Sequence, residues 1–455
     1  MAWKACVKTI LLFLILFVMP FGGIVLDFHA YTQLPNEADV NSVIPESFNL
    51  IWRIHILAQE SIESNVELFM YNERYLIVVL KGDSSICKVD TYNVRSIPIY
   101  FAYRIAPIYR VTATLVGDKL LMVGSDCRNL EFVCIDVDDM SVLWIHRTNY
   151  TFTLSTPLFF RLVSYRDIVY VFKWWGLFIP ESELKLPYYQ VYVVNLTSGS
   201  VNVVNLFRKE GFFNGVFNEM VYVTPVVHQG HIVCVFNRAW WDDKYLYFRE
   251  VVMLCDLHLN VLYSKDAHRL INSNAPSWLL KVFKSNGHLF FIFESCKSCL
   301  SERSYLLAEF EIDAVREVFS LHVLLNTTKP KESLKYKSCF YIMFAYSKWF
   351  MIYGPAIACY SLNGSKVWMR VLSDPTSSMI ETFKFFTAAS NGFIILSSFD
   401  AFPFIGLIAM NYNGSIYWSK YLEIAHFNPA MHRGLLFHDS KVFVALVNGT
   451  LLCIG

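Results

Sequence analysis

The stretch ACYSLNGSKVW, residues 358–368, decides the fold of this chain. An apolar run leads into the dipeptide Asn363-Gly364, and a second short run follows that ends in Val367-Trp368. Asn-Gly between two apolar runs is typical of a two-residue hairpin turn, because both residues accept the positive φ that this turn requires. The stretch therefore predicts two antiparallel strands, the second of which carries a Trp.

The same pattern recurs along the chain. Residues 408–418 read IAMNYNGSIYW, and residues 133–144 read VCIDVDDMSVLW. Each copy follows two further apolar runs, so one unit predicts four short strands in roughly 50 residues. Two apolar stretches that resemble membrane spans, 338–362 and 385–412, belong to such units, and we interpret them as strands. Less regular copies lie at 75–100, 168–206, 231–266 and 288–322.

The two ends of the chain complement each other. The last unit stops after the runs Val442–Val447 and Leu451–Ile454, so it lacks an outer strand. The run Leu50–Ile54, LIWRI, has the apolar–Trp character of that missing strand. Pairing of the two ends would leave no exposed sheet edge. The sequence therefore predicts an all-β fold, an eight-bladed β-propeller of four-stranded blades over residues 48–455, with its ring closed by the N-terminal strand.

These repeats resemble the blades of the pyrroloquinoline-quinone-like propellers, the quinoprotein alcohol dehydrogenase-like family. The family consensus reads approximately Y-A-L-D-x-x-T-G-K-x-x-W, and its counterparts here are Val133–Asp136 with Leu143-Trp144, and residues 358–368. The resemblance implies that the Trp of the motif wedges between neighbouring blades. The residues at this blade-packing position are Trp52, Trp144, Trp368 and Trp418.

The chain lacks the cofactor motifs of the dehydrogenases in that family. Those enzymes hold their quinone with an adjacent-Cys disulfide and a calcium ion, and this chain contains no Cys-Cys pair. Its C-x-x-C motif, Cys296 to Cys299, is not followed by His, so we interpret it as a turn disulfide or two free thiols. No catalytic, cofactor-binding or metal-binding residue is predicted. Five cysteines at one position of five repeats are interpreted as core thiols: Cys87, Cys134, Cys255, Cys359 and Cys453.

The N-terminus predicts export. Lys4 and Lys8 precede an uncharged run, Thr9 to Leu26. As a helix this run would be about 27 Å long, close to the hydrocarbon thickness of a bilayer. We predict that residues 1–26 form an apolar helix outside the domain, either a cleaved signal peptide or a retained membrane anchor that crosses the membrane through residues 9–26. Residues 27–47 are predicted to be a polar linker, and the rest of the chain to be extracytoplasmic.

Long insertions are predicted on one face of the propeller, between the second and third strands of a unit. Rigid scaffolds commonly carry their binding residues on such loops. Two insertions contain Trp pairs beside Tyr and carboxylates, which suits stacking on sugars or anchoring of a protein partner. The alternative is that they are extended hairpins in which one Trp of each pair is buried. The insertions are 173–190, 237–251, 294–305 and 397–406, and the ligand-face candidates are Trp174, Trp175, Tyr188, Tyr189, Trp240, Trp241, Asp242 and Asp243.

Composition limits the class of partner. The chain has 39 Lys+Arg and 38 Asp+Glu, a formal net charge of +1, and so lacks the basic excess typical of nucleic-acid-binding proteins. In an exported protein, Asn-x-Ser/Thr sequons are candidate glycosylation sites. They occur at Asn149, Asn195, Asn326, Asn363, Asn413 and Asn448.

We therefore expect a monomeric, non-catalytic propeller, secreted or anchored to the membrane, that acts as a binding scaffold for a protein or carbohydrate partner at the cell surface. The alternative is an enzyme with its site in the central channel, such as a quinone-dependent (PQQ-type) dehydrogenase of sugars or alcohols. PQQ and calcium are expected only under that alternative. Propellers host both classes, so the fold does not choose between them.

Overall fold

The computed structural model of the chain is all-β in the part that it describes, with strands joined by turns. The described residues are 43–44, 47–55, 66–80, 85–92, 99–101, 111–126, 129–149, 158–175, 188–208, 219–241, 246–267, 277–285, 287–296, 303–313, 315–328, 340–345, 348–353, 356–361, 365–372, 381–399, 404–423, 435–445 and 450–455.

The chain divides into two compact units. The first comprises Met1–Phe48 and Pro330–Ala430, and the second comprises Asn49–Lys329 and Met431–Gly455. The strands of the first unit are β22 (Phe340–Ala345), β23 (Lys348–Tyr353), β24 (Ala356–Ser361), β25 (Lys366–Val371), β26 (Glu381–Ala388), β27 (Gly392–Phe399), β28 (Phe404–Asn411) and β29 (Ile416–Glu423).

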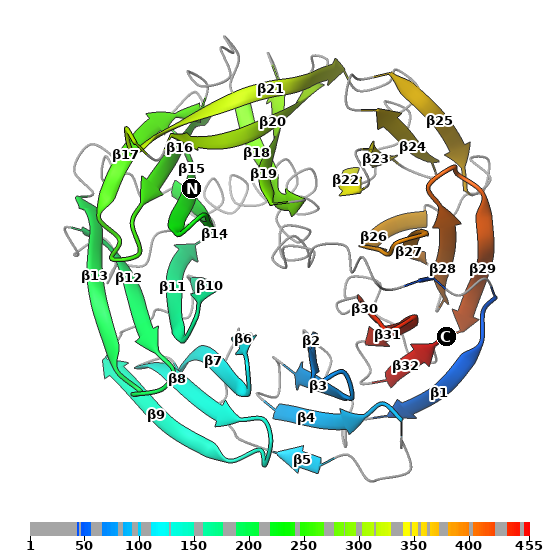
Figure 1. Cartoon of the computed structure of the whole chain (residues 1–455), viewed down its shortest axis with the longest axis horizontal. Helices are drawn as coiled ribbons and strands as arrows, with labels where there is room; N and C mark the ends of the chain where they lie inside the picture. Colours follow the sequence, from blue (N-terminus) through cyan, green and yellow to red (C-terminus); the bar gives the residue numbers. More distant parts are fainter. Residues whose placement is uncertain are drawn as a thin grey trace, which may run out of the picture. The chain divides into compact units, whose positions relative to one another are not determined.

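The second unit contains the remaining strands, coloured in sequence order in Figure 1. They are β1 (Leu50–His55), β2 (Val66–Tyr71), β3 (Tyr75–Leu80), β4 (Ser85–Asp90), β5 (Ile99–Phe101), β6 (Thr112–Val116), β7 (Lys119–Asp126), β8 (Asn129–Asp136), β9 (Val142–Asn149), β10 (Leu158–Tyr165), β11 (Ile168–Trp175), β12 (Tyr188–Asn195), β13 (Val201–Arg208), β14 (Glu219–His228), β15 (His231–Trp241), β16 (Leu246–Cys255), β17 (Val261–Asp266), β18 (Ser277–Ser285), β19 (His288–Cys296), β20 (Arg303–Asp313), β21 (Val318–Thr328), β30 (Leu435–His438), β31 (Lys441–Ala445) and β32 (Thr450–Ile454).

Most sheets are antiparallel sets of four strands in chain order: β2–β5, β6–β9, β18–β21, β22–β25 and β26–β29. The repeats β10–β13 and β14–β17 differ from this pattern, because they share one eight-stranded sheet. A single pairing, Trp175 with Val221, joins β11 to β14. The stretches 338–362 and 385–412 hold β22–β24 and β26–β28, which confirms that they form strands.

The outer strand of the last sheet comes from the beginning of the chain. The order of this sheet is β1-β32-β31-β30. In its register Trp52 lies opposite Cys453 and Ile54 opposite Leu451. The amide of Gly455 adds a hydrogen bond to the carbonyl of Asn49, at 3.0 Å. The run Leu50–Ile54 therefore occupies the outer position that its apolar–Trp sequence predicts.

A recurrent Asx turn follows the third strand of six repeats. The side-chain Oδ1 accepts a hydrogen bond from the backbone N–H two residues later, for example 2.8 Å from Asp138 to Asp136 and 3.0 Å from Asn413 to Asn411. This local bond favours the tight reversal into the fourth strand. The capping residues are Asp90, Asp136, Asn195, Asp256, Asp313 and Asn411.

The Trp of the repeat contacts this turn in the next sheet. Trp144 Nε1 donates to the carbonyl of Leu196 at 3.0 Å, and Trp368 Nε1 donates to that of Tyr412 at 3.0 Å. In both cases the acceptor directly follows the Asx cap. Trp52 donates to the carbonyl of Thr91, the equivalent residue, at 3.4 Å. These indoles therefore link successive sheets at a repeated point.

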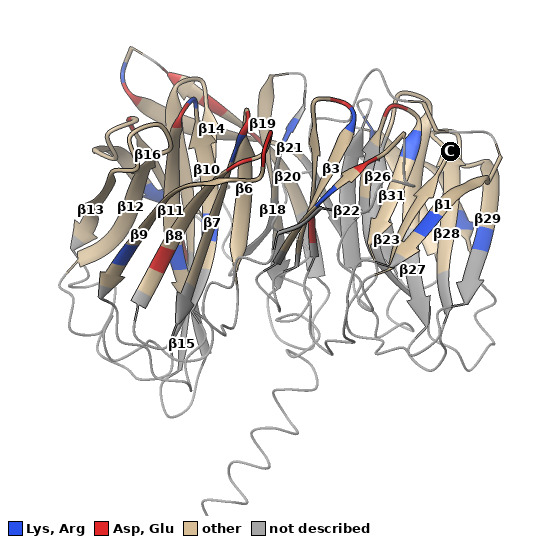
Figure 2. Cartoon of the chain, turned by 90° about the horizontal axis from the view of Figure 1, so that it is seen from below, with Lys and Arg blue, Asp and Glu red and all other residues tan. Residues whose placement is uncertain are grey.

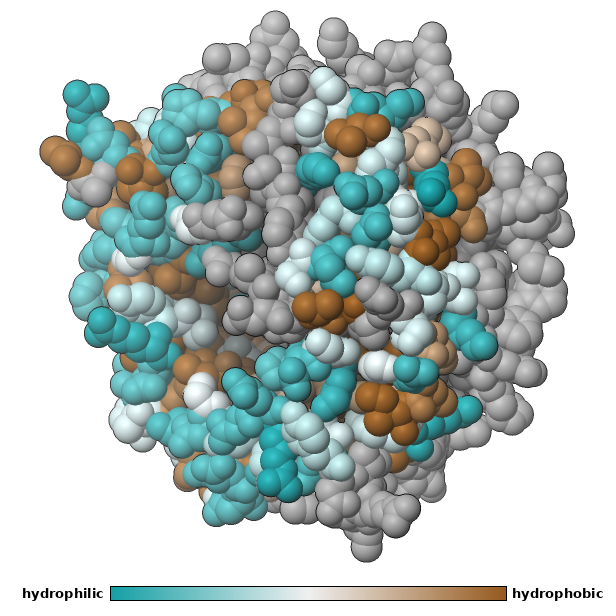
Figure 3. Space-filling view, turned by 45° about the vertical axis from the view of Figure 1, so that its right-hand side comes forward, coloured by the Kyte–Doolittle hydropathy of each residue, from teal (hydrophilic) through white to brown (hydrophobic). Residues whose placement is uncertain are grey.

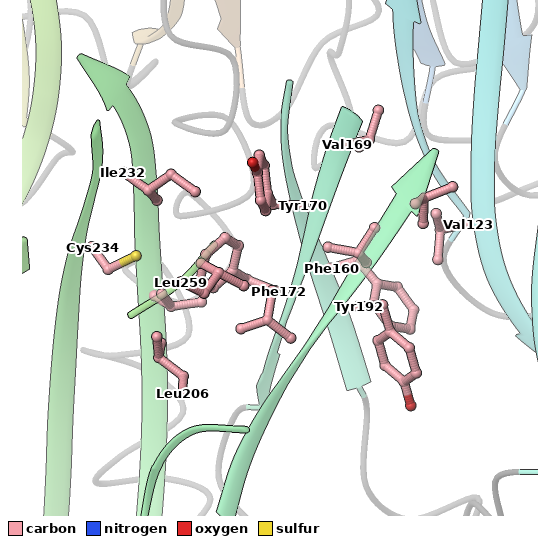
Figure 4. Close-up of a cluster of buried hydrophobic side chains, with 14 of the residues drawn as sticks. Val123, Phe160, Val169, Tyr170, Phe172, Tyr192, Leu206, Ile232, Cys234 and Leu259 are labelled. Atoms are coloured by element: carbon pink, nitrogen blue, oxygen red, sulfur yellow. The ribbon is translucent and has the colours of Figure 1, made fainter. Parts of the chain in front are cut away.

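The largest apolar cluster lies on both faces of the strands β11 and β12 (Figure 4). Phe172 and Val191 are fully buried in it, together with Phe132 from the preceding sheet and Phe236 from the following repeat. Strands that are covered on both faces are apolar at nearly every position, which explains the continuous apolar runs of the sequence.

Six cysteines are buried free thiols: Cys87, Cys134, Cys234, Cys255, Cys359 and Cys453. The position shared by five repeats falls on the third strand of each sheet, at Cys87, Cys134, Cys255, Cys359 and Cys453. Burial raises the pKa of Cys134 and Cys359 to about 11, and that of Cys87 and Cys453 to about 12.

Two predicted segments involve residues outside the described ranges. Residues 1–26 lie outside it altogether. Within the described residues there is no helix of a length and apolarity that would cross a membrane. Of the predicted linker 27–47, Ile44 is described and does not behave as a free linker residue. It is 1% exposed, and its N–H and carbonyl bond the side-chain amide of Asn391 at 2.8 and 3.0 Å.

Candidate functional site

The two ends of the strands differ in construction. One end, which we call the turn end, carries the tight turns between the first and second strands and the Asx turns described above. In Figure 2 these turns lie at the upper ends of the strands, and several carry Asp or Glu, drawn in red. The opposite end, where the second and third strands connect, we call the insertion end. The turn end is occupied by repeated structural contacts, whereas the insertion end is not built from this repeated contact.

Buried charged side chains in the second unit lie toward the insertion end. Glu67 is the second residue of β2, Glu131 the third of β8, and Lys173 the third from the end of β11. Glu250 lies in the first half of β16. All four are at most 8% exposed. Burying a charge is costly unless it is paired or hydrogen-bonded, so the partners of these side chains matter for the fold of this end.

The glutamates join neighbouring strands. Glu67 Oε2 accepts a hydrogen bond from the amide of Ala113 at 2.9 Å, which links β2 to β6 in the next sheet. Glu131 accepts from Arg147 at 2.9 Å, and the side chain of Arg147 is 65% exposed. The Glu131–Arg147 pair therefore connects a buried carboxylate to a guanidinium at the surface.

Lys173 is fully buried among aromatic rings. Its Nζ lies 5.4 Å from the centroid of the Tyr192 ring, a distance at which a cation is attracted to the ring face. Its backbone carbonyl accepts a hydrogen bond from the hydroxyl of Tyr189. The ring of Tyr192 also packs 5.4 Å from Phe132 of the preceding sheet. Lys173 thus lies where two sheets meet.

An aromatic cluster next to Lys173 holds the two joined repeats together. Tyr189 stacks on Phe207 at 5.2 Å, and Phe236 packs edge-on against both rings at 5.1 Å. Trp174, 1% exposed, has the guanidinium of Arg161 5.2 Å from its ring. These rings explain why β11 and β14 approach closely enough to pair.

The hairpin β15–β16 extends the insertion end further. In it Trp240 lies opposite Tyr247 and Trp241 opposite Leu246. The predicted insertion 237–251 is therefore mostly strand, which agrees with the alternative that it is an extended hairpin. A paired strand positions its residues more rigidly than a loop does.

The ligand-face candidates separate into three groups. Trp174 and Tyr189 are buried core residues, so their assignment to an exposed face was wrong for the folded chain. Adjacent strand residues point to opposite faces, which buries one residue of such a pair. Tyr188, 36% exposed at the start of β12, remains a surface candidate. The structure gives the strand positions, but not the exposure, of Trp175, Trp240 and Trp241. Outside the described residues lie Asp242 and Asp243.

Sequence reasoning missed the buried charges. A signal was present for Lys173, which is a single cation inside the run Val169–Trp175. A charge flanked by apolar residues on both sides of a strand is either exposed at an edge or buried with partners. The sequence does not distinguish these two cases, because the partner ring, Tyr192, belongs to another strand.

The predicted disulfide and glycosylation sites lie partly outside the described residues. Cys296 is the last residue of β19, and Cys299 lies outside the described residues. Asn195 and Asn413 lie in or beside Asx turns, and Asn413 is exposed. The structure describes Asn149 and Asn326 by strand position, whereas Asn363 and Asn448 lie outside the description. In the described ranges, three or more His, Cys, Asp or Glu side chains do not come together as a metal site would require.

Exposed apolar side chains lie chiefly on the outer strands of the sheets. On the face drawn in Figure 3, hydrophobic residues form separate brown areas between hydrophilic ones. The exposed apolar side chains include Leu50, Ile51, Leu143, Ile145, Val203, Val261, Val323, Val367, Val371 and Ile416.

Comparison with known proteins shows the fold. The chain is similar to the structure of the Dos1 propeller, with a TM-score of 0.53 and 9% identity over 90% of this chain and 95% of that one. It is also similar to BamB from Moraxella catarrhalis (TM-score 0.44, 8% identity, 90% and 97% covered). A third similar structure is virginiamycin B lyase from Staphylococcus aureus (TM-score 0.40, 9% identity, 90% and 99% covered). No family model and no curated protein matches the sequence. The chain is thus an all-β protein with a β-propeller fold.

Proposed function

We propose that this chain is a non-catalytic β-propeller that binds a protein or glycan partner at its insertion end. The observation that carries the proposal is the contrast between the two ends of the strands. The turn end repeats one structural contact, Trp to Asx turn. The insertion end instead holds buried Glu67, Glu131 and Lys173 and, among the described strands, the pairing through which two repeats share a sheet.

Partner binding fits the chemistry of this end. Aromatic residues provide large contact areas, and Arg is enriched in protein interfaces. Tyr188 and Arg147 are exposed toward the insertion end, next to the buried Tyr189 and Glu131 that hold their strands. Buried residues such as Tyr189 and Glu131 hold the exposed side chains beside them in place before a partner binds.

The test uses two matched tyrosines. Tyr188 lies at the insertion end, and Tyr92, 61% exposed, lies at the turn end after β4. A photo-crosslinking benzoylphenylalanine replaces one or the other in the full chain, expressed in its native cell. We expect one discrete adduct from position 188, lost when Trp240→Ala and Trp241→Ala are added, and no equivalent adduct from position 92. Equal adducts from both positions, or none from position 188 together with no binding on a glycan array, would contradict the proposal.

The finer architecture is part of the same proposal. We propose that the strands form eight four-stranded blades in one ring and that the β1–β32 pairing closes it. The support is that the strands fall into eight successive sets of four, the last set completed by β1. Electron microscopy of the purified chain tests this, and an open array or another number of blades would overturn it.

The proposals on location and cofactor rest on the sequence alone. We propose that the chain is exported, with residues 1–26 as signal peptide or anchor, and that it is monomeric. Mass spectrometry of protein from the extracytoplasmic fraction tests this, and intact chain found exclusively in the cytosol would contradict it. The dehydrogenase alternative is tested by adding PQQ and calcium with sugars or alcohols and measuring reduction of an artificial electron acceptor.

A further inference from the structure

His228 lies at a seam between two repeats. It is the last residue of β14, it is 5% exposed, and its ring centre is 6.4 Å from that of Phe310 on β20. Phe310 stacks on Phe319 at 4.9 Å, and Phe319 packs edge-on against Tyr263 of β17 at 5.1 Å. We call the contact between β14–β17 and β18–β21 the His228 seam. Its aromatic rings come from both repeats.

The titratable groups near His228 are basic. They are Lys284 on β18, His288 on β19 and His231 on β15, among the described residues. His288 pairs with Glu309 at 2.5 Å, and its side chain is 60% exposed. Nδ1 of His231 lies 2.9 Å from the carbonyl of Gln229. Burial, followed by these positive neighbours, lowers the pKa of His228 to about 4.

The backbone holds the ring in this place. His228 pairs with His231 across the two-residue turn Gln229-Gly230, where both turn residues have positive φ, 49° and 74°. A turn of this kind is short and fixes the end of β14. The backbone that carries the ring is therefore held at the seam.

We propose that the His228 seam is an acid-sensitive contact, which opens when His228 takes up a proton. A proton on the ring would place a positive charge between the rings of two repeats and beside Lys284. Among the described residues, the groups that act on the charge of this ring are themselves basic, so the charge is costly in the closed seam, and opening of the seam hydrates it. The proposal goes beyond partner binding, because it gives the molecule a response to acidification that does not depend on the identity of the partner.

Linkage gives the direction and size of the effect. In the open state the pKa of His228 is the ordinary one of His, near 6.5, which is higher than its pKa in the closed seam. The contact is therefore fully stable above about pH 6.5 and is weakened as the pH falls toward 4. Between pH 7 and pH 5 the opening equilibrium should rise about 20-fold.

Hydrogen exchange of the full chain measures this opening. Exchange is followed at pH 7 and pH 5, with rates corrected for the intrinsic effect of pH, in peptides that contain the end of β14 and the start of β19. We expect about 20-fold faster corrected exchange at pH 5 in the unmodified chain. In His228→Phe, which keeps a ring against Phe310 but cannot take up a proton, we expect less than about a 2-fold change.

A matched control separates this seam from other histidines. His322→Phe on β21 removes an exposed His that pairs with Glu311 at 3.1 Å, and it should keep the full acid response. The same acid response in His228→Phe as in the unmodified chain, or no response in the unmodified chain, would overturn the proposal. If His228→Phe does not fold, His228→Gln decides, because its side chain cannot take up the proton either. A full acid response in His228→Gln would refute the mechanism.

Discussion

At the scale of single residues, two glycines are needed where a Trp packs on the next sheet. A Cβ at Gly414 would lie 2.8 Å from the Trp368 ring, and one at Gly199 would lie 3.0 Å from the Trp144 ring. Both glycines also have positive φ, 85° and 71°. The Ser-Gly and Asn-Gly turns of the repeat therefore serve the indole contact as well as the hairpin.

Gly414→Ala should destabilise the chain by about 2–4 kcal/mol, because it combines a disfavoured φ with overpacking against Trp368. Gly287→Ala is the matched control, since Gly287 has φ 77° and no atom within 4 Å of the added methyl. It should cost only about 1–2 kcal/mol. Denaturant unfolding measures both, and equal losses would show that the indole contact adds nothing.

Tyr71 should make stability fall at alkaline pH. Its hydroxyl donates to Asp138 at 2.6 Å, and this bond is the main reason that the pKa of Tyr71 is raised to about 12. The pKa of Tyr71 is higher in the folded chain than in the unfolded chain, where it is near 10. The contribution of this hydrogen bond to the free energy of unfolding is therefore complete below pH 10 and is lost as the pH rises toward 12. Tyr71→Phe should cost about 1 kcal/mol at pH 7 and flatten the stability profile between pH 10 and 12. An unchanged alkaline profile in Tyr71→Phe would contradict this assignment.

The buried thiols should be inert in the folded chain. Burial raises the pKa of Cys87, Cys134, Cys359 and Cys453, and the thiolate is the reactive form. Iodoacetamide at pH 8 should leave these residues unmodified in buffer and label them all in urea, as peptide mass mapping would show. Rapid labelling of Cys134 without denaturant would mean that its sheet opens readily.

At the scale of elements, the N-terminal strand should contribute directly to stability. Trp52 on β1 donates to Thr91 and packs 6.0 Å from Phe443 of β31. Trp52→Ala should lower the free energy of unfolding by about 2–3 kcal/mol, less than for a fully buried Trp, because the ring is half-buried. Trp52→Phe, which keeps the ring but loses the donor, should cost less. Thermal unfolding compares the stability of the two variants. An unchanged stability in Trp52→Ala would mean that β1 is dispensable.

The sequence predicts some elements well and others poorly, for local reasons. Hairpins such as β24–β25 and β28–β29 are recognisable because the Asx or Asn-Gly turn and the Trp lie within a dozen residues. The length of β15 was not predictable, because residues 237–241 are held by pairing with β14 and β16 instead of by a pattern of their own.

The candidate site was partly predictable. The insertion end and its Trp pairs are evident in the sequence, but which ring is buried depends on contacts between repeats. Trp174 and Tyr189 are buried by neighbours on other strands, such as Phe207 and Phe236. Lys173 was missed for the same reason, since its environment is formed by residues distant in the sequence.

At the scale of the whole molecule, removal of β1 should change the state of association. Without residues 1–55, β32 presents an unpaired edge, and such edges promote edge-to-edge pairing between chains. Light scattering should then detect dimers or larger species. A chain that lacks only residues 1–42, and so keeps Ile44 and β1, should behave like the full one. Monomeric behaviour of both truncations would show that β1 does not protect the edge.

The pairing of β1 with β32 also has a consequence for biosynthesis. The two strands are separated by almost 400 residues, and a ribosome adds about 5–20 residues per second. The first strand to be made must therefore wait roughly 20–80 seconds for its partner while the sheets between them form. The nascent chain carries an apolar segment throughout that interval, which makes it a natural client for chaperones that hold unfinished proteins.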